Sequence, residues 1–336
     1  MIRLDELIGY SRITIQCHDV PDADALASGF ALYCYFHSKN IPVELIYSGK
    51  MRISKSDLEL MISELDIPVT YRAPEYDAHI DGLLIMVDCQ YGTGNVTKFE
   101  ADEVAVIDHH IVEMQENELC DIRPELGSCS TLCWSLLERA GYSVNDNEKL
   151  ATALYYGLYR DTVAFADMSD RLDKEMFCRL EYNKKIYDVI RNTNISMKDL
   201  RTTGVALIRS MYNNSHNYGI IPYDGPCDPN ILGIISDILL SVEGVDVCCV
   251  YNILPDGYKM SVRSVLPDKP ANELSAYLTE GIGSGGGHHT KAGGFISEEA
   301  FLEKYDCMSI DAYLAERMHQ YFEEKQHKHN CEGHHH

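Results

Sequence analysis

The first 110 residues alternate short aliphatic runs with segments of helical pattern, and this alternation restricts the fold more than any other feature. Helical patterns cover residues 25–37 and 54–65, and two more follow at 128–140 and 147–158. The aliphatic runs, each a predicted strand, are RITIQCH (12–18), VELIYSG (43–49), GLLIMVD (82–88) and EVAVIDHH (103–110). Strands that are apolar throughout and alternate with helices are typical of parallel sheets covered on both faces. The sequence therefore predicts an α/β fold in which helices flank a parallel sheet.

Three of these predicted strands end in ionisable residues. The first ends at His18, the third at Asp88 and the fourth at Asp108, His109 and His110. Open parallel sheets bind ligands outside the carboxyl ends of their strands, so these side chains are expected to converge. Strand alternation would point Asp108 and His110 to one side and His109 to the other. Taken alone, each strand end could equally be a solvated polar cap.

Further acidic residues lie close to these strand ends. Asp22 and Asp24 follow His18 in HDVPDADALASG, and Asp161 follows a predicted helix in GLYRDTVAF. With Asp88, His18 and His109 they make four carboxylates and two imidazoles, a mixture that suits divalent transition ions such as Mn²⁺. Two such ions could clamp a phosphate group. Any one of these residues alone could instead be a solvated turn residue or a helix cap.

Composition excludes several classes of protein. The 336 residues suffice for two domains, and 45% of them are hydrophobic. We expect a cytoplasmic protein without a membrane segment, because no apolar run has spanning length, the first 20 residues lack signal-peptide features and the 12 cysteines form no CxxC pair. The net charge of −23 argues against a protein that grips long duplex DNA. It is compatible with a small phosphorylated substrate.

The second half predicts another domain. Its elements are a strand at 217–224, a helix at 230–240, a hairpin over 245–265, the glycine-rich segment GIGSGGGHHTKAGGF (281–295) and a helix near 311–324. We therefore divide the chain into a domain at 1–185, a linker at 186–205 and a domain at 206–328. The final residues, 332–336 (EGHHH), look like the remnant of an expression tag.

Six motifs, in order, resemble a known family. HDVPDADA, LLIMVDC, VAVIDHH and GLYRDT resemble the four motifs of the DHH phosphoesterase superfamily, which is RecJ-like. SVRS (261–264) and GSGGGHHTKAGG (283–294) resemble its DHHA1 domain. The resemblance implies an N-terminal DHH domain, a smaller C-terminal α/β DHHA1 domain and a cleft between them. The compact layout looks most like stand-alone nanoRNases and adenosine bisphosphate (pAp) phosphatases.

The resemblance also implies a set of metal ligands. One Mn²⁺ would be held by His18, Asp22 and Asp88, and a second by Asp24, Asp88, His109 and Asp161. Asp108 would orient a histidine rather than bind metal. His110 would face the substrate as a catalytic residue that hydrogen-bonds or protonates a phosphate oxygen.

The C-terminal motifs imply the residues that bind substrate. These are Arg263, Ser264, Gly285, Gly286, Gly287 and His288, with Lys291 as a further cation. Glycine backbone can approach an anion closely, and a guanidinium pairs well with phosphate. Without the family, the glycine segment could be a flexible linker and Arg263 a surface cation.

The implied activity is hydrolysis of phosphate esters by hydroxide activated at two divalent metal ions. The implied substrates are short: nanoRNA, pApA-type dinucleotides or adenosine 3′,5′-bisphosphate. Two alternatives stay open, a metal-dependent nucleotide sensor without turnover and an enzyme for a cyclic dinucleotide or short polyphosphate. A homodimer is also left open. Arg160, directly before Asp161, departs from the expected motif and could contact substrate or pair with an acid.

Overall fold

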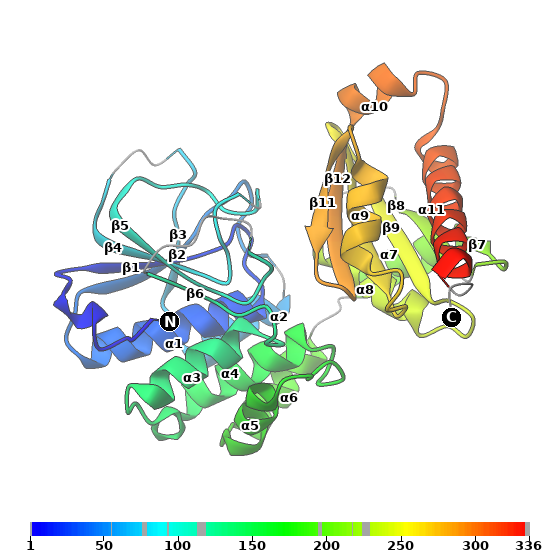
Figure 1. The fold of residues 1–336 in the computed structure, drawn as a ribbon. Coiled ribbons are helices and arrows are strands. Elements are labelled where there is room, and N and C mark those ends of the chain that lie inside the picture. Colours follow the sequence, from blue (N-terminus) through cyan, green and yellow to red (C-terminus); the bar gives the residue numbers. More distant parts are fainter. Residues whose placement is uncertain are drawn as a thin grey trace. The chain divides into compact units, whose positions relative to one another are not determined.

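The computed structural model describes residues 2–54, 56–75, 79–92, 94–112, 119–193, 197–216, 218–223 and 229–332. The chain divides into two compact units, Met1–Ile195 and Ser196–His336. Each unit has a six-stranded sheet and its own hydrophobic core (Figure 1).

The N-terminal unit contains an entirely parallel sheet in the order β3-β2-β1-β4-β5-β6. Its strands are β1 (Ile13–Cys17), β2 (Val43–Tyr47), β3 (Val69–Tyr71), β4 (Ile80–Val87), β5 (Ala101–Asp108) and β6 (Cys120–Ile122). The strand order reverses between the neighbours β1 and β4, and such a switch point is where open α/β sheets form ligand sites.

Helices pack against this sheet from one side (Figure 1). The helical segments of the unit are η1 (Leu7–Gly9), α1 (Ala23–Ser38), α2 (Ser56–Leu65), α3 (Cys129–Arg139), η2 (Val144–Asp146), α4 (Glu148–Asp161), α5 (Arg171–Arg179) and α6 (Lys184–Asn192). Alternate strand residues such as Leu83, Ile85 and Val87 join the helical core. On the opposite face, Leu84 packs with Phe99 of the β4–β5 connection. Because both faces are covered, the central strands are apolar throughout.

The C-terminal unit is a mixed sheet in the order β11-β12-β10-β9-β8-β7, in which only the β8–β9 pair is parallel. The strands are β7 (Met211–Asn213), β8 (Tyr218–Tyr223), β9 (Val247–Leu254), β10 (Gly257–Ser264), β11 (Gly283–Gly287) and β12 (Lys291–Ser297). The helices are α7 (Met197–Ile208), α8 (Pro229–Leu240), α9 (Ala271–Thr279), α10 (Glu298–Lys304) and α11 (Ile310–Glu332).

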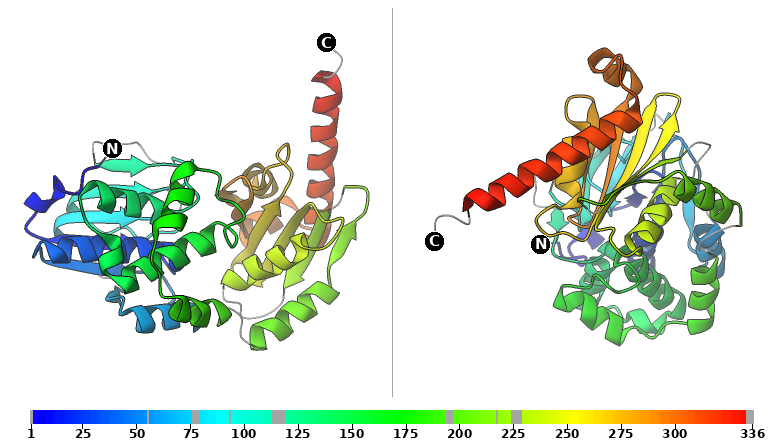
Figure 2. Two further views of the ribbon diagram at one scale, coloured as in Figure 1. Left: turned by 90° about the horizontal axis from the view of Figure 1, so that it is seen from below. Right: turned by 90° about the vertical axis from the view of Figure 1, so that its right-hand side faces the viewer.

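Two separate clusters cover the faces of this second sheet. Ile235 of α8 packs with Cys248 and Val250, whereas Leu274 of α9 and Leu314 of α11 pack with Cys249 and Tyr251. The vicinal Cys248 and Cys249 thus point to opposite faces, as strand alternation requires. The last helix, α11, is long and uninterrupted (Figure 2).

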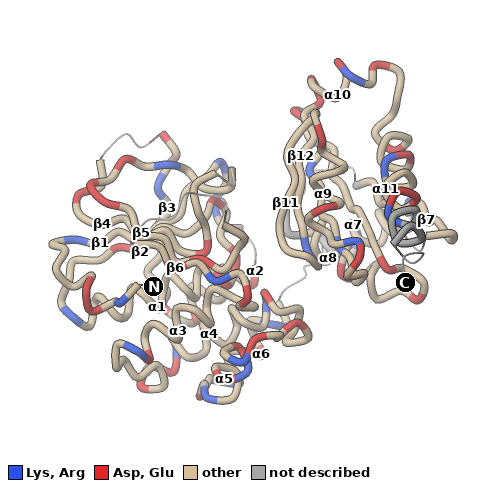
Figure 3. Tube along the Cα trace, in the orientation of Figure 1, with Lys and Arg blue, Asp and Glu red and all other residues tan. Residues whose placement is uncertain are grey.

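The expected α/β fold is confirmed in both units. The predicted linker at 186–205 coincides largely with α6 and α7, and the glycine-rich segment at 281–295 forms the antiparallel pair of β11 and β12. Within the described part of the chain, every helix is too short or too polar to cross a membrane. Acidic and basic residues are interspersed along both units (Figure 3).

Candidate functional site

The carboxyl ends of β1, β4 and β5 bring together six residues predicted as metal ligands. His18 follows β1, Asp88 follows β4 and His109 follows β5. Asp22 and Asp24 lie at the start of α1, and Asp161 is the last residue of α4. Their ligand atoms fall into two groups of three, His18 with Asp22 and Asp88, and Asp24 with His109 and Asp161.

His18 presents its Nε2 atom to two carboxylates. Nε2 lies 3.9 Å from Asp22 Oδ1 and 3.8 Å from Asp88 Oδ2, while Nδ1 lies 3.0 Å from the Asp19 carbonyl oxygen. A carbonyl accepts only from a protonated nitrogen, so Nδ1 carries the hydrogen and Nε2 is the atom available to a metal. Burial alone would lower the pKa of His18, but Asp22 and then Asp88 raise it to about 9.

His109 is held in the same manner but is more deeply buried. Its Nδ1 atom donates to the Leu126 carbonyl oxygen at 3.1 Å. Its Nε2 atom lies 3.2 Å from Asp161 Oδ2, 3.3 Å from Asp88 Oδ1 and 3.7 Å from Asp24 Oδ2. Burial would lower the pKa of His109, but Asp161 and Asp88 raise it well above its ordinary value. The imidazole therefore sits among three carboxyl groups.

Asp88 is the carboxylate shared by the two histidines. Its Oδ2 faces His18 and its Oδ1 faces His109, and its side chain is only 2% exposed. Among the described residues, no group donates a hydrogen bond of normal geometry to the buried Oδ1. Burial raises the pKa of Asp88, and its backbone has a left-handed φ of 59°. A buried carboxylate oxygen without a donor, in a strained backbone, fits a position between two cations.

The two aspartates of α1 have different supports. Asp22 caps the helix, and its Oδ1 accepts from the backbone N–H groups of Asp24 at 2.9 Å and Ala25 at 3.0 Å. Burial would raise the pKa of Asp22, but His18 holds it at about 2. Burial and the charges of Asp88 and Asp161 raise the pKa of Asp24 well above its ordinary value.

Asp24 is fixed by the N-terminus of α3, a support that sequence reasoning missed. The Cys129 N–H donates to Oδ2 at 2.7 Å, and Ser130 donates to Oδ1 through its N–H at 2.9 Å and through its hydroxyl. A helix N-terminus favours an anion at this place. The sequence predicts a helix over residues 128–140, which indicates where α3 begins but not what lies against its N-terminus.

Asp108 accepts several hydrogen bonds and lies beside the cluster. Its Oδ1 accepts from the His109 N–H at 2.8 Å, and its Oδ2 accepts from Gln90 Nε2 at 2.9 Å. His110 Nδ1 also donates to Oδ1 at 2.8 Å. Burial would raise the pKa of Asp108, but the contacts with His110 lower it below its usual range. Sequence reasoning did not identify Gln90, which has no motif signal.

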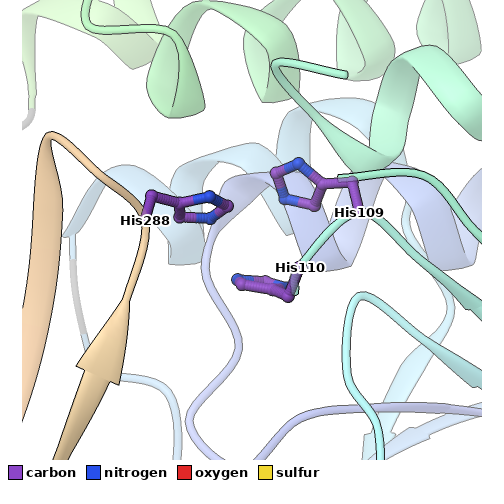
Figure 4. Close-up of side chains that lie close together, drawn as sticks. All are labelled: His109, His110 and His288. Atoms are coloured by element: carbon purple, nitrogen blue, oxygen red, sulfur yellow. The ribbon is translucent and has the colours of Figure 1, made fainter. Parts of the chain in front are cut away.

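The His109 and His110 rings lie next to each other, with centroids 4.7 Å apart (Figure 4). His110 Nδ1 lies 3.8 Å from Asp88 Oδ1, so both rings approach the same carboxylate oxygen. The predicted alternation of sides therefore ends at Asp108, the last residue of β5. Burial would lower the pKa of His110, but the Asp108 contact raises it.

The segment after α4 has an unusual backbone. Val163, Ala164 and Phe165 have φ values of 49°, 56° and 69° in succession. Such left-handed conformations are costly for residues with a side chain and often occur at functional sites.

Arg160, which departs from the expected motif, pairs with the buried Asp57 at 3.9 Å. Its positive charge therefore has an acidic partner within the fold, as one of the two expectations for this residue held.

The residues predicted to bind substrate lie in the C-terminal unit. Arg263 on β10 donates from Nε to Asp237 Oδ1 at 2.9 Å, and the Ser264 hydroxyl accepts from the Leu266 N–H at 3.1 Å. His288 follows β11 (Figure 4). A Cβ added to Gly285 would lie 2.5 Å from the Ser275 carbonyl oxygen. One added to Gly286 would meet no heavy atom of the described residues within 4 Å.

The glycines therefore differ in their structural role. Gly285 is required by packing against α9, and Gly287 has a φ of 141°, which favours glycine. Gly286 is constrained by neither effect. Gly286 and Gly287 are both exposed, whereas Gly285 is half-buried.

The N-terminal cluster has the donors for two divalent cations. Each histidine offers Nε2 while a carbonyl oxygen holds its Nδ1 atom, and each faces at least two carboxylates. Asp88 offers one oxygen to each group. Nitrogen and carboxylate ligands in this proportion suit Mn²⁺ and similar ions.

Comparison with known proteins gives a family match for the N-terminal unit. Residues 12–158 match the DHH family, N-terminal domain. An uncharacterized protein of Methanocaldococcus jannaschii is 26% identical over 283 residues, which make up 83% of this chain and 57% of that protein. The chain thus spans little more than half the length of this curated relative.

Solved structures give a further comparison, and one of them shares the fold. An exopolyphosphatase-related protein from Bacteroides fragilis has a TM-score of 0.71 at 21% identity, over 96% of this chain and 95% of that chain. RecJ from Thermus thermophilus in complex with Mn²⁺ gives a TM-score of 0.49 at 18% identity, over 94% of this chain and 53% of that chain. Residues 12–158 of the N-terminal unit are thus similar to the N-terminal domain of the DHH family, and the Bacteroides protein shares the fold.

Proposed function

We propose that the protein is a metal-dependent phosphoesterase that hydrolyses short phosphorylated nucleotides. The observation that carries this proposal is Asp88, whose two buried oxygens face two different histidines and whose Oδ1 accepts no hydrogen bond of normal geometry from the described residues. One shared carboxylate between two imidazole–carboxylate groups is the arrangement expected for a pair of divalent cations. The match of residues 12–158 to the DHH family supports it.

The residues that would hold the cations follow from the two groups. His18, Asp22 and Asp88 would bind one, and Asp24, Asp88, His109 and Asp161 the other. When bound, such ions neutralise charge on phosphoryl oxygens and make water a stronger nucleophile at neutral pH. Mn²⁺ is our proposal for the ion, since the donor set mixes imidazole with carboxylate.

The surroundings of His110 support a role for this residue in holding a proton for the reaction. Its Nδ1 donates to Asp108, and Asp108 is itself fixed by Gln90 and by two backbone N–H groups. The raised pKa of His110 favours the protonated ring, which can donate from Nε2 to a phosphate oxygen or a leaving group. We propose His110 as the catalytic acid, with Asp108 as its orienting partner.

The substrate that we propose is short. A net charge of −23 opposes binding of long nucleic acid but not of a dinucleotide such as pApA or a bisphosphate such as adenosine 3′,5′-bisphosphate. Arg263, Ser264, Gly286 and His288 are the proposed phosphate-binding residues of the C-terminal unit. The Bacteroides relative is called exopolyphosphatase-related, so short polyphosphate belongs among the substrates tested.

The test is product release by the purified protein with Mn²⁺. The panel contains pApA, adenosine 3′,5′-bisphosphate, a 24-nucleotide RNA, cyclic-di-AMP and short-chain polyphosphate. His109→Ala removes a proposed ligand, and His37→Ala is a matched control at the C-terminal end of α1. We expect turnover of pApA or the bisphosphate by the wild type and His37→Ala, and a loss of at least about 100-fold in His109→Ala.

Other outcomes would assign the site differently. Turnover of polyphosphate alone would keep metal-dependent hydrolysis at phosphorus, but of a phosphoanhydride, and would overturn the nucleotide ester as the substrate. Metal-dependent binding of pApA without any turnover would overturn the enzyme in favour of a sensor. Equal activity in the wild type and His109→Ala would overturn the proposed metal centre.

A further inference from the structure

A second cluster of metal-binding side chains lies in the C-terminal unit. It contains His216, from the turn between β7 and β8, together with His319 and Glu323 from α11. One ligand atom of each residue lies within 4.8 Å of the others. All three residues belong to the same compact unit, and none of them belongs to the motifs discussed above.

The helix supplies two of the three side chains from one face. His319 and Glu323 are four residues apart, so they project from successive turns of α11 toward the same side. This is the spacing at which a helix commonly presents two ligands to one metal ion. Phe322, between them in sequence, is buried in the core that α11 forms with the sheet, which fixes the rotation of the helix.

The hairpin supplies the third side chain in a fixed position. Asn213 Oδ1 accepts from the backbone N–H groups of Ser215 at 2.9 Å and His216 at 3.2 Å. Asn213 Nδ2 also donates to the Tyr218 hydroxyl at 3.2 Å, and the His216 and Tyr218 rings are stacked. The turn therefore holds the His216 ring against α11, with its centroid 5.3 Å from that of His319.

The cluster is buried at the side chain of His216 and partly exposed to solvent at that of Glu323. The His216 side chain is 5% exposed and Glu323 is 45% exposed, and His216 Nε2 lies 3.1 Å from Glu323 Oε1. In a tetrahedral zinc site, bonds of about 2.0–2.1 Å place neighbouring ligand atoms about 3.4 Å apart. The His216–Glu323 separation is close to that value. A plain ion pair would involve these two groups, but it gives no reason for His319 to lie beside them.

We propose that His216, His319 and Glu323 bind a divalent transition-metal ion of the zinc type. Two imidazoles and one carboxylate are the protein ligands of many zinc sites, with a further position left to water. The ion would join the β7–β8 hairpin to the C-terminal helix and so stabilise the C-terminal unit. This site has one carboxylate for two imidazoles, whereas the N-terminal cluster is rich in carboxylates, so the two differ in metal preference.

The experiment must separate this site from the histidines near the C-terminus. The reference protein is the full chain with alanine at His327, His329, Cys331, His334, His335 and His336. His216→Ala, His319→Ala and Glu323→Gln are each made in this reference. Gln320→Ala, one residue from His319 on the exposed side of α11, is the matched control. Circular dichroism checks that each variant is folded.

Two readouts test the proposal. Zn²⁺ bound per chain is counted after dialysis, and Co²⁺ binding is followed through its visible absorption, which reports coordination by nitrogen and oxygen ligands. We expect the three ligand variants to bind one Zn²⁺ fewer than the reference and to lose one component of the Co²⁺ spectrum, while Gln320→Ala matches the reference. Equal Zn²⁺ content and equal spectra in the reference and the folded variants would overturn the site and leave only an ion pair.

Discussion

At the scale of single residues, His18 and His109 of the N-terminal unit are oriented in the same way. In each, Nδ1 is held by a backbone carbonyl, from Asp19 for His18 and from Leu126 for His109. Each Nε2 then faces carboxylates, so the ring is oriented for a metal before one binds. Such preorganisation lowers the conformational entropy that is lost on binding.

His18 makes metal binding depend on pH. The pKa of His18 is raised from 6.5 to about 9. In the metal-free protein, its interaction with Asp22 and Asp88 stabilises the fold fully below pH 6.5, and this stability is lost as the pH rises through 9. A metal requires the neutral ring, so below pH 9 it competes with a proton. Mn²⁺ affinity, measured by calorimetry, is expected to rise by up to about tenfold per unit between pH 7 and 9.

The control for this pH effect is a variant that lacks the titrating imidazole of His18. His18→Gln should bind Mn²⁺ more weakly than the wild type and with a shallower dependence on pH, because one proton no longer competes. His37→Ala should follow the wild type. Affinity that stays constant from pH 7 to 9 in the wild type would contradict the role of His18.

Gly285 and Gly286 provide a matched test of substrate binding. A methyl group at Gly285 would lie 2.5 Å from both the Ser275 carbonyl and hydroxyl oxygens, so Gly285→Ala should destabilise the protein by about 1–3 kcal/mol. Gly286→Ala has room for its methyl group and should change the free energy of unfolding by less than about 0.5 kcal/mol. If Gly286 contacts substrate phosphate, this variant should nevertheless raise KM by about tenfold. Unchanged KM in Gly286→Ala would remove Gly286 from the substrate site.

The sequence motifs identified the proposed ligands but not the residues that hold these ligands in place. His18, Asp88 and His109 were predictable because each follows an apolar run that must be a buried strand. Gln90 and Ser130 were not, because their roles depend on which loop or helix end meets Asp108 and Asp24 in three dimensions. The environment of Arg263 was equally unpredictable, because its partner Asp237 lies on a different element, α8.

At the scale of elements, the close approach of three helices fixes Asp24. Gly157 of α4 faces Ser130 of α3 and Ala27 of α1. A Cβ at Gly157 would lie 2.2 Å from Ser130 Oγ and 3.1 Å from Asp24 Oδ1. The glycine is therefore required where α1, α3 and α4 meet, and the contact lies directly behind a proposed metal ligand.

Gly157→Ala should therefore affect both stability and metal binding. We expect a loss of about 1–3 kcal/mol in the free energy of unfolding, because the methyl group displaces Ser130. Displaced Ser130 also moves Asp24, so the Mn²⁺ ion proposed at Asp24, His109 and Asp161 should bind more weakly in calorimetry. Ser130→Ala in the same chain frees space and should restore part of the stability, a non-additivity that a double-mutant cycle measures. Strictly additive effects would contradict the steric explanation.

Element prediction succeeded where hydrophobic patterns were long. The strands β1, β4 and β5 and the helices α1, α3 and α4 have continuous or periodic apolar residues and were predicted near their observed bounds. The three-residue strands β3 and β6 are too short to give a pattern. Strand β11 reads GSGGG, and its place in the sheet comes from pairing with β12 rather than from any intrinsic strand preference.

At the scale of the whole molecule, the two units have independent cores and different candidate metal sites. The core of the N-terminal unit contains residues of the sheet that ends in the His18 and His109 cluster, whereas the C-terminal unit has clusters on both faces of its own sheet. A ligand that binds only a folded site stabilises the unit that contains it. The units should therefore respond separately to the metal that each prefers.

Mn²⁺ should stabilise the N-terminal unit selectively. At a concentration 100 times its dissociation constant, a ligand contributes about 2.7 kcal/mol, which raises the Tm of a domain of this size by about 5–10 °C. In calorimetry we expect Mn²⁺ to shift one unfolding transition, and EDTA to reverse the shift.

Asp88→Asn should abolish this Mn²⁺ shift and raise the Tm of the metal-free protein. Burial and the charge of Asp22 raise the pKa of Asp88 in spite of its contacts with His109 and His110, so its ionised form destabilises the fold near neutral pH, and asparagine removes that charge. Greater stability without metal, together with lost metal binding, would identify Asp88 as a residue retained for function rather than for folding. A metal-free Asp88→Asn protein that is less stable than the wild type would instead assign Asp88 a structural role.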